Sequence, residues 1–289
     1  EDENDKYSYG ILDGGHTYTA IIQNRDKIPS DIEKYVRMEV ITNVVNITRL
    51  SDARNTSVQV SDIALFNLED SFEDIKLSIQ DQPYASKIAY KDNETKPIGI
   101  SELLRLMYAF DIEKYPDDKM APIQSYSGKA QVFKRYKDAF NGKFYKSLTK
   151  QLPKLTELYD IIEREMSDKY GEYKRALGVA IPRFGGVKGV EYVESGVKTE
   201  FFENKIKYSI SSGYIYPVYG AFRSLLKMND ETGEVEWVFD PIEIWNEVGV
   251  SIIQNVFETG SNPQLVGKDK QLWLSNYRIV ETESEKAFK

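Results

Sequence analysis

The residues whose types and spacing best suit chemistry lie in one glycine turn near the start of the chain. The turn follows the short apolar run 10–12 and precedes the helix-like stretch 18–24. A strand that passes through glycines into a helix leaves free backbone N–H groups at the positive end of the helix dipole, which favours a phosphate or another anion there. The candidate ligand-binding residues of this turn are Asp13, Gly14, Gly15, His16 and Thr17.

The side chains of this turn have both a chemical and a structural interpretation. His16 is the only histidine in the chain, and it could donate to an anion or exchange a proton near neutral pH. Thr17 could bind a phosphate oxygen, and Asp13 could orient His16 or hold a metal ion. In the structural interpretation, Asp13 or Thr17 caps the helix in a tight turn that binds nothing.

A second polar stretch, 47–57, is rich in side chains that bind anions or sugars. Arg54 could make bidentate contacts with a phosphate, while Asn55 and Thr56 orient it. The alternative is a polar helix end in which Asn55 and Thr56 serve as caps.

Together, the segments 11–17 and 51–57 resemble the AIPR family of bacterial proteins, which is associated with abortive infection and phage resistance. The family pattern is an apolar strand, an Asn- or Asp-Gly-x-His/Gln-Thr turn, a second strand and an Asn-containing polar motif. The resemblance extends more loosely to the tail, where Gly-Lys at 267–268 precedes Leu-Trp-Leu at 272–274.

The glycine turn is also similar to the Asp-Gly-Gln-His-Arg motif of DNA-modification-linked proteins and to the turn of ParB-like and sulfiredoxin-like domains. These resemblances imply a small α/β domain that binds the phosphates of a nucleotide or acts on DNA. Thr17 stands where those motifs have an arginine. Arg49 or Arg54 would therefore have to supply the missing charge.

A basic segment, 129–188, lies between two acidic parts of the chain. It holds 14 Lys and Arg against 7 Asp and Glu, a net charge of +7, whereas the whole chain has a net charge of −8. Lysines alternate with aromatic residues between 133 and 146, which could hold a nucleic-acid backbone and stack its bases. The alternative is that the rings are core and the lysines their solvated rim. The nucleic-acid candidates are Lys134, Arg135, Lys137, Lys143 and Lys146.

Apolar periodicity predicts an α+β protein, or loosely an α/β one. Its start resembles a small ParB/sulfiredoxin-like β-α-β domain, and a mainly helical region with a few strands follows. The elements expected in the first part are a strand at 7–12, a helix at 17–25, a strand at 36–42, and helices at 46–54, 61–80 and 101–110. The stretch 115–128 is expected to be a linker or an exposed loop. The predicted domains are 1–120 and 121–289.

The second part has clear helix and strand signals. Apolar residues at helical spacing predict a helix from Leu152 with Pro153 in its first turn. Alternating residues predict strands at 205–210 and 235–239. Asp240 has the form of an N-cap for a helix that ends near Gly260. The glycine cluster at 183–189 lacks the spacing of a phosphate-binding loop and fits a hairpin or a mobile loop better.

Composition sets broad limits on function. The chain has no cysteine, which removes disulfides and thiolate metal sites and favours a cytoplasmic setting. No run of apolar residues is long enough for a membrane span. The first residue is not Met, so an upstream segment is expected. A single histidine excludes a histidine-based zinc site.

Three functions remain open from the sequence. The favoured one is a bacterial phage-defence protein that binds a nucleotide or nucleic-acid phosphate through the glycine turn. The second is a metal-dependent nuclease or nucleotide hydrolase in which Asp13, Glu39 or Asp52 holds Mg²⁺, so that Mg²⁺ with a nucleotide is the candidate cofactor. The third is a sensor with a purely structural turn that binds a protein partner or a second copy of itself.

Overall fold

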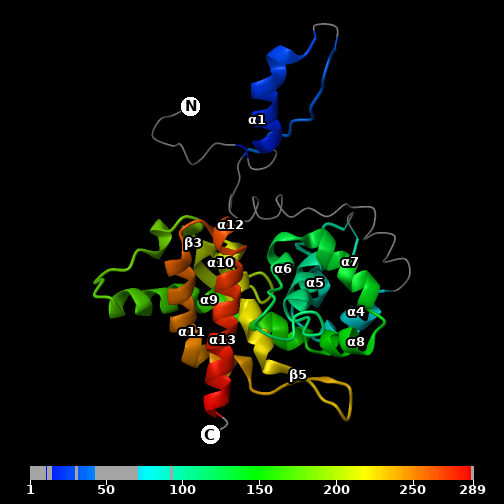
Figure 1. The fold of residues 1–289 in the computed structure, drawn as a ribbon, viewed down its shortest axis with the longest axis vertical. Coiled ribbons are helices and arrows are strands. Elements are labelled where there is room, and N and C mark those ends of the chain that lie inside the picture. Colours follow the sequence, from blue (N-terminus) through cyan, green and yellow to red (C-terminus); the bar gives the residue numbers. More distant parts are fainter. Residues whose placement is uncertain (1–10, 12–14, 30–31, 43–70, 92–93, 288–289) are drawn as a thin grey trace. The chain divides into compact units, whose positions relative to one another are not determined.

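The architecture is that of a computed structural model, which describes residues 11, 15–29, 32–42, 71–91 and 94–287 (Figure 1). Contacts within the chain divide it into two compact units, Glu1–Thr56 and Ser57–Lys289. The predicted domain boundary between 120 and 121 falls inside the second unit, and it stays a prediction.

The described part of the first unit is a helix followed by chain without regular secondary structure. Helix α1 (Gly15–Asn24) continues into a short 3-10 helix, η1 (Arg25–Lys27), which agrees with the predicted helix at 17–25. The predicted strand at 36–42 is wrong, because residues 32–42 form neither helix nor strand. Val36, Met38 and Val40 alternate as a strand should, yet all three are more than 60% exposed. A strand needs a hydrogen-bonding partner and a covered face, and the described residues supply neither.

Two other predictions for this region lie outside the described residues. They are the helix at 46–54 and most of the strand at 7–12. The likeness to ParB-like and sulfiredoxin-like domains therefore stays a prediction.

The second unit begins with short elements around a buried helix. Helix α4 (Glu73–Ile79) is the described end of the predicted helix at 61–80, and Phe72, Ile75 and Ile79 are buried as expected. A 3-10 helix, η2 (Ala85–Lys87), leads into β1 (Ile88–Ala89), which pairs in parallel with β2 (Ile98–Gly99). Helix α5 (Ile100–Ala109) confirms the helix predicted at 101–110.

The basic segment is largely helical, as predicted. It comprises α7 (Lys129–Ala139), α8 (Lys143–Lys150) and α9 (Leu152–Ala176), and the short α6 (Gln124–Ser127) precedes it. Pro153 lies in the first turn of α9, where its missing N–H costs no helical hydrogen bond.

The stretch 115–128 is not the expected linker or exposed loop. Tyr115, Ser125 and Tyr126 are buried. Arg223 fixes the start of the stretch by donating to three of its backbone carbonyls, those of Tyr115 at 3.4 Å, Asp117 at 3.1 Å and Met120 at 3.1 Å. A fourth hydrogen bond, at 2.8 Å, holds the arginine itself to the Gly220 carbonyl. The prolines and polar residues that suggested a linker instead belong to a partly buried segment that ends in helix α6 and is held by a distant side chain.

Two antiparallel hairpins follow α9. The 3-10 helix η3 (Phe184–Gly186) occupies the glycine cluster and precedes β3 (Val190–Lys198), which pairs with β4 (Lys205–Ile210). The second hairpin joins β5 (Leu226–Met228) to β6 (Val235–Trp237). The predicted strands at 205–210 and 235–239 are therefore confirmed in their main parts.

The last helices close the unit. They are α10 (Ser212–Tyr219), the 3-10 helix η4 (Gly220–Leu225), α11 (Pro241–Thr259), α12 (Pro263–Val266) and α13 (Lys270–Ala287). Asp240 caps α11 as predicted, since its side chain accepts a hydrogen bond from the Ile242 N–H at 2.8 Å. None of the described helices has the length and apolarity that crossing a membrane requires.

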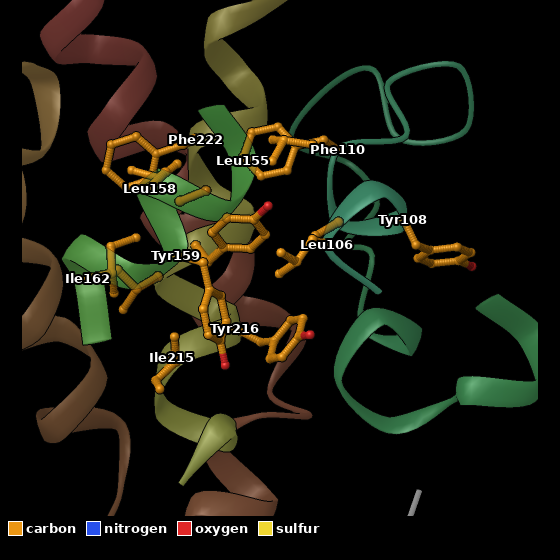
Figure 2. Close-up of a cluster of buried hydrophobic side chains, with 14 of the residues drawn as sticks. Leu106, Tyr108, Phe110, Leu155, Leu158, Tyr159, Ile162, Ile215, Tyr216 and Phe222 are labelled. Atoms are coloured by element: carbon orange, nitrogen blue, oxygen red, sulfur yellow. The ribbon is translucent and has the colours of Figure 1, made fainter. Parts of the chain in front are cut away.

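The core of the second unit is built around α9. Leu155, Tyr159 and Ile162 of this helix are buried against α5, α10 and α11. Figure 2 shows Tyr159 in a cluster with Leu106 of α5, Tyr216 of α10 and Phe222 of η4. Helices thus dominate, and the described strands are few and short, which confirms the predicted α+β class.

Candidate functional site

The glycine turn is described only in part. Helix α1 begins at Gly15, so Gly15 and Thr17 belong to the first helical turn and not to a loop before it. The Thr17 side chain is exposed. Asp13, Gly14 and the side chain of His16 lie outside the description, as do the predicted partners Arg54, Asn55 and Thr56. An anion site formed by these two motifs stays a prediction.

The basic candidates on α7 and α8 are all described, and we use the name lysine surface for the four lysines among them, two on α7 and two on α8: Lys134, Lys137, Lys143 and Lys146. All four side chains are exposed. Among the residues that the structure describes, no carboxylate forms an ion pair with any of these ammonium groups at a distance of 4.0 Å or less. The lysine surface is therefore available to an external anion.

The aromatic residues between these lysines are core, and the interpretation that they stack nucleic-acid bases is wrong. Phe133, Tyr136, Phe144 and Tyr145 are at most 6% exposed, and Phe140 is half-buried. Tyr136 and Tyr145 meet edge to face, with ring centroids 6.0 Å apart, and so join α7 to α8. The rings fix the positions of the two lysine-bearing helices, and the lysines are their solvated rim.

Arg135 differs from the four lysines because it is already paired. Its Nε lies 2.7 Å from Oδ2 of Asp111, which is fully buried, and its Nη2 lies 2.9 Å from Oε2 of Glu113. The hydrogen bond to Asp111 is the main reason that the pKa of Arg135 is raised. Tyr145 donates to the same carboxylate at 3.1 Å. Arg135 thus anchors α7 to the end of α5 and is not free to bind a ligand.

An open groove lies beside the lysine surface, between α4, α8 and the turn of the β5–β6 hairpin, and we call it the α8 groove. Its volume is about 590 Å³. The residues that line it are Asp74, Leu77, Ser78, Lys143, Lys146, Ser147, Thr149, Lys150, Thr232, Gly233 and Glu234. In Figure 1, α4 and α8 lie close together, and the hairpin after β5 extends below them.

The charges of the α8 groove are arranged along one helix face. Lys143, Lys146 and Lys150 are three and four residues apart, which places them on one side of α8. Lys150 pairs with Glu234 of the hairpin, with Nζ 2.8 Å from Oε1. Asp74 contributes the other carboxylate, so the lining carries three positive and two negative charges. A groove of this size and charge suits a small anionic group.

Comparison with known proteins gives the family of the chain. A family model described as AIPR protein matches residues 3–264. The chain belongs to the AIPR family. Membership connects it with abortive infection and phage resistance. Searches of curated proteins and of solved structures gave no match.

The sequence of this AIPR chain indicates only part of the groove. The row of lysines is visible in it, because Lys150 continues the helical spacing of Lys143 and Lys146. Asp74 and Glu234 could not be placed there, since they lie far from α8 along the chain. Among the described residues, no three carboxylate or histidine side chains are grouped so as to hold a metal ion.

Proposed function

We propose that this AIPR protein acts in phage defence in the bacterial cytoplasm by binding the phosphates of nucleic acid with its lysine surface. The observation that carries the proposal is the set of four exposed ammonium groups on α7 and α8 that have no acidic partner among the described residues. Lysines that neutralise phosphates release the condensed counterions, which drives binding without sequence preference.

The fold supports this role because it holds the lysines on two anchored helices. Buried rings join α7 to α8, and Arg135 ties α7 to the buried Asp111. The two helix backbones that carry the lysines are therefore positioned before the ligand binds, so that the lysine side chains are the main groups to be ordered on binding. The overall charge of −8 does not prevent this, because the positive charge is concentrated in one segment.

The test is binding of labelled oligonucleotides, measured by fluorescence anisotropy over a range of salt concentrations. With four lysine–phosphate contacts, log K should fall against log salt with a slope of about −3 for a single strand. Replacing Lys137 and Lys146 with glutamine should reduce the slope to about −1.4, since each contact contributes roughly 0.7.

The matched control is Lys205→Gln on β4. Lys205 is also exposed, and β3, the strand that pairs with β4, lies on the opposite side of the unit from α7 and α8 (Figure 1). This variant should bind like the wild type. An equal loss in the control and in the double variant would contradict the proposal. Cleavage of the oligonucleotide only in Mg²⁺ would favour the nuclease instead.

We also propose that the glycine turn with His16, together with Arg54, binds a nucleotide phosphate. The support is the matched family pattern and the helix that begins at Gly15. Thermal unfolding with nucleoside triphosphates, with and without Mg²⁺, tests it. A ligand at 100 times its dissociation constant should add about 2.7 kcal/mol to the free energy of unfolding. His16→Ala should lose this shift, and Asn24→Ala, at the other end of α1, should keep it.

A further inference from the structure

The α8 groove already contains a negatively charged group of the protein itself, the carboxylate of Glu234. Both carboxylate oxygens of Glu234 lie near Nζ of Lys150, Oε1 at 2.8 Å and Oε2 at 2.9 Å. Lys150 is the main cause of a lowered pKa for Glu234, and the Ser147 hydroxyl and the charge of Lys143 act in the same direction. The end of the groove near Lys150 is thus arranged around a negative group.

The backbone that carries Glu234 is held in place. Asn229 organises the turn, since its side-chain oxygen accepts hydrogen bonds from the backbone N–H groups of Glu231 at 2.9 Å and Thr232 at 3.1 Å. The next residue, Val235, is bound to α8 because its N–H donates to the Ser147 hydroxyl at 2.6 Å. The carboxylate therefore reaches Lys150 from a fixed position.

The ion pair itself is easily opened. Lys150 and Glu234 are 63% and 43% exposed, and exposed ion pairs contribute little to stability. A phosphodiester of a nucleic-acid strand carries the same single negative charge as a carboxylate, so it can replace Glu234 beside Lys150 at small cost, and the strand gains further contacts with Lys143 and Lys146.

The size of the groove limits which phosphate-containing ligands can reach Lys150. A volume of about 590 Å³ is in the range of sites for single small ligands. The lysines from 143 to 150 extend about 10 Å along the helix axis at 1.5 Å per residue. A single nucleotide with its phosphates fits these dimensions, whereas a groove of about 590 Å³ is too small to enclose a double helix.

We propose that the α8 groove is the subsite for a phosphate of single-stranded nucleic acid, and that Glu234 occupies this subsite until the strand displaces it. This inference rests on the proposed function, because it concerns the same ligand class. It adds a specificity for unpaired strands and a residue that limits affinity. Lys143 and Lys146 hold the neighbouring phosphate oxygens, while Lys150 becomes available when Glu234 leaves.

The experiment compares single-stranded and duplex oligonucleotides of equal length on the wild type, Glu234→Gln and Glu236→Gln. Glu236 provides the matched control, since it lies on the same hairpin and hydrogen-bonds Asn229 at 3.0 Å, outside the groove. A duplex has the higher charge density, so a surface that senses charge alone would prefer it. We expect the wild type to prefer the single strand.

Glu234→Gln should bind the single strand about threefold more tightly than the wild type, because an exposed competing ion pair is removed. Glu236→Gln should match the wild type, and thermal unfolding should show that both variants are folded. Equal affinities for single strand and duplex, or equal effects of the two variants, would overturn the subsite while leaving binding by the lysine surface intact. No binding of either oligonucleotide by the wild type would overturn the proposed function as well.

Discussion

Glu102 shows how strongly this fold can hold a partly buried charge. Its Oε2 lies 2.6 Å from Nη1 of Arg105, and its Oε1 lies 2.7 Å from Nζ of Lys129. Arg105 also donates to the backbone carbonyl of Ser125 at 2.7 Å and lies over the ring of Tyr216 at 4.4 Å. Burial by itself would raise the pKa of Glu102, but the charges of Arg105 and Lys129 outweigh it and lower the pKa from 4.5 to about 2.

This pKa predicts a pH-dependent contribution to stability. A carboxylate whose pKa is lowered in the folded state stabilises the protein fully above its unfolded pKa and loses this contribution as the pH falls through the folded pKa. The difference in free energy of unfolding between the wild type and Glu102→Gln should therefore decrease between pH 4.5 and 2, by an amount on the order of 3 kcal/mol. Urea unfolding at several pH values measures it. Glu247→Gln, at an exposed position, is the control, and pH curves of the wild type and Glu102→Gln that run parallel would contradict the prediction.

The interactions of individual side chains could be predicted from the sequence only where the two residues involved lie close together in the chain. The spacing of Lys143 and Lys146 indicated one helix face, and the structure confirms that face. Arg135 is a basic residue directly after Lys134 and lies in the same local sequence, yet its side chain is bound to Asp111, 24 residues away. Glu234 is 84 residues from Lys150. Such pairs depend on the tertiary fold, and the local pattern of charges does not predict which distant residues come together.

Among the elements, α11 has the strongest local signals. Asp240 is followed by a first-turn proline, Pro241, and the helix ends at Thr259, directly before Gly260. Sequence alone predicts this helix because its caps act within one turn of each end. The stretch 36–42 also has a clear local pattern, but a strand requires a neighbour, and the described residues provide none.

Removing the cap of α11 should have a limited cost. Asp240→Ala should lower the free energy of unfolding by about 1 kcal/mol, because the Ile242 N–H loses its acceptor. Asp240→Asn keeps a capping oxygen and should lose much less. This second variant also measures the exposed contact between Asp240 and Lys154, whose atoms lie 3.3 Å apart. An equal loss in both variants in chemical denaturation would show that the charge, and not the cap, stabilises the helix.

For the whole molecule, the end of the chain completes the core that earlier helices begin. Trp273 of α13 is fully buried, and its indole N–H donates to the Gly267 carbonyl at 2.9 Å. Gly220, at the start of η4, packs directly against this ring, and an added Cβ would lie 2.4 Å from Cζ3 of Trp273. Two segments far apart in the sequence therefore share one close contact.

Gly220→Ala should destabilise the second unit by about 1–3 kcal/mol, the usual cost of overpacking a well-packed core. Gly260→Ala is the matched control, because its nearest neighbour would be Val266 Cγ2 at the ordinary contact distance of 3.5 Å. Thermal unfolding followed by tryptophan fluorescence measures both. If the two variants lose the same stability, the contact between η4 and α13 is not tightly packed in solution.

Arg223 has a consequence for how this molecule tolerates mutation. Its guanidinium holds the loop through main-chain carbonyls, and it lies over the ring of Tyr277 at 4.3 Å. Every peptide unit offers the same carbonyl, so this interaction does not depend on which side chains occupy 117–120. The loop can drift in sequence while its path is preserved, and the selective constraint falls on one distant arginine. A lysine offers too few donors in the wrong geometry to replace it.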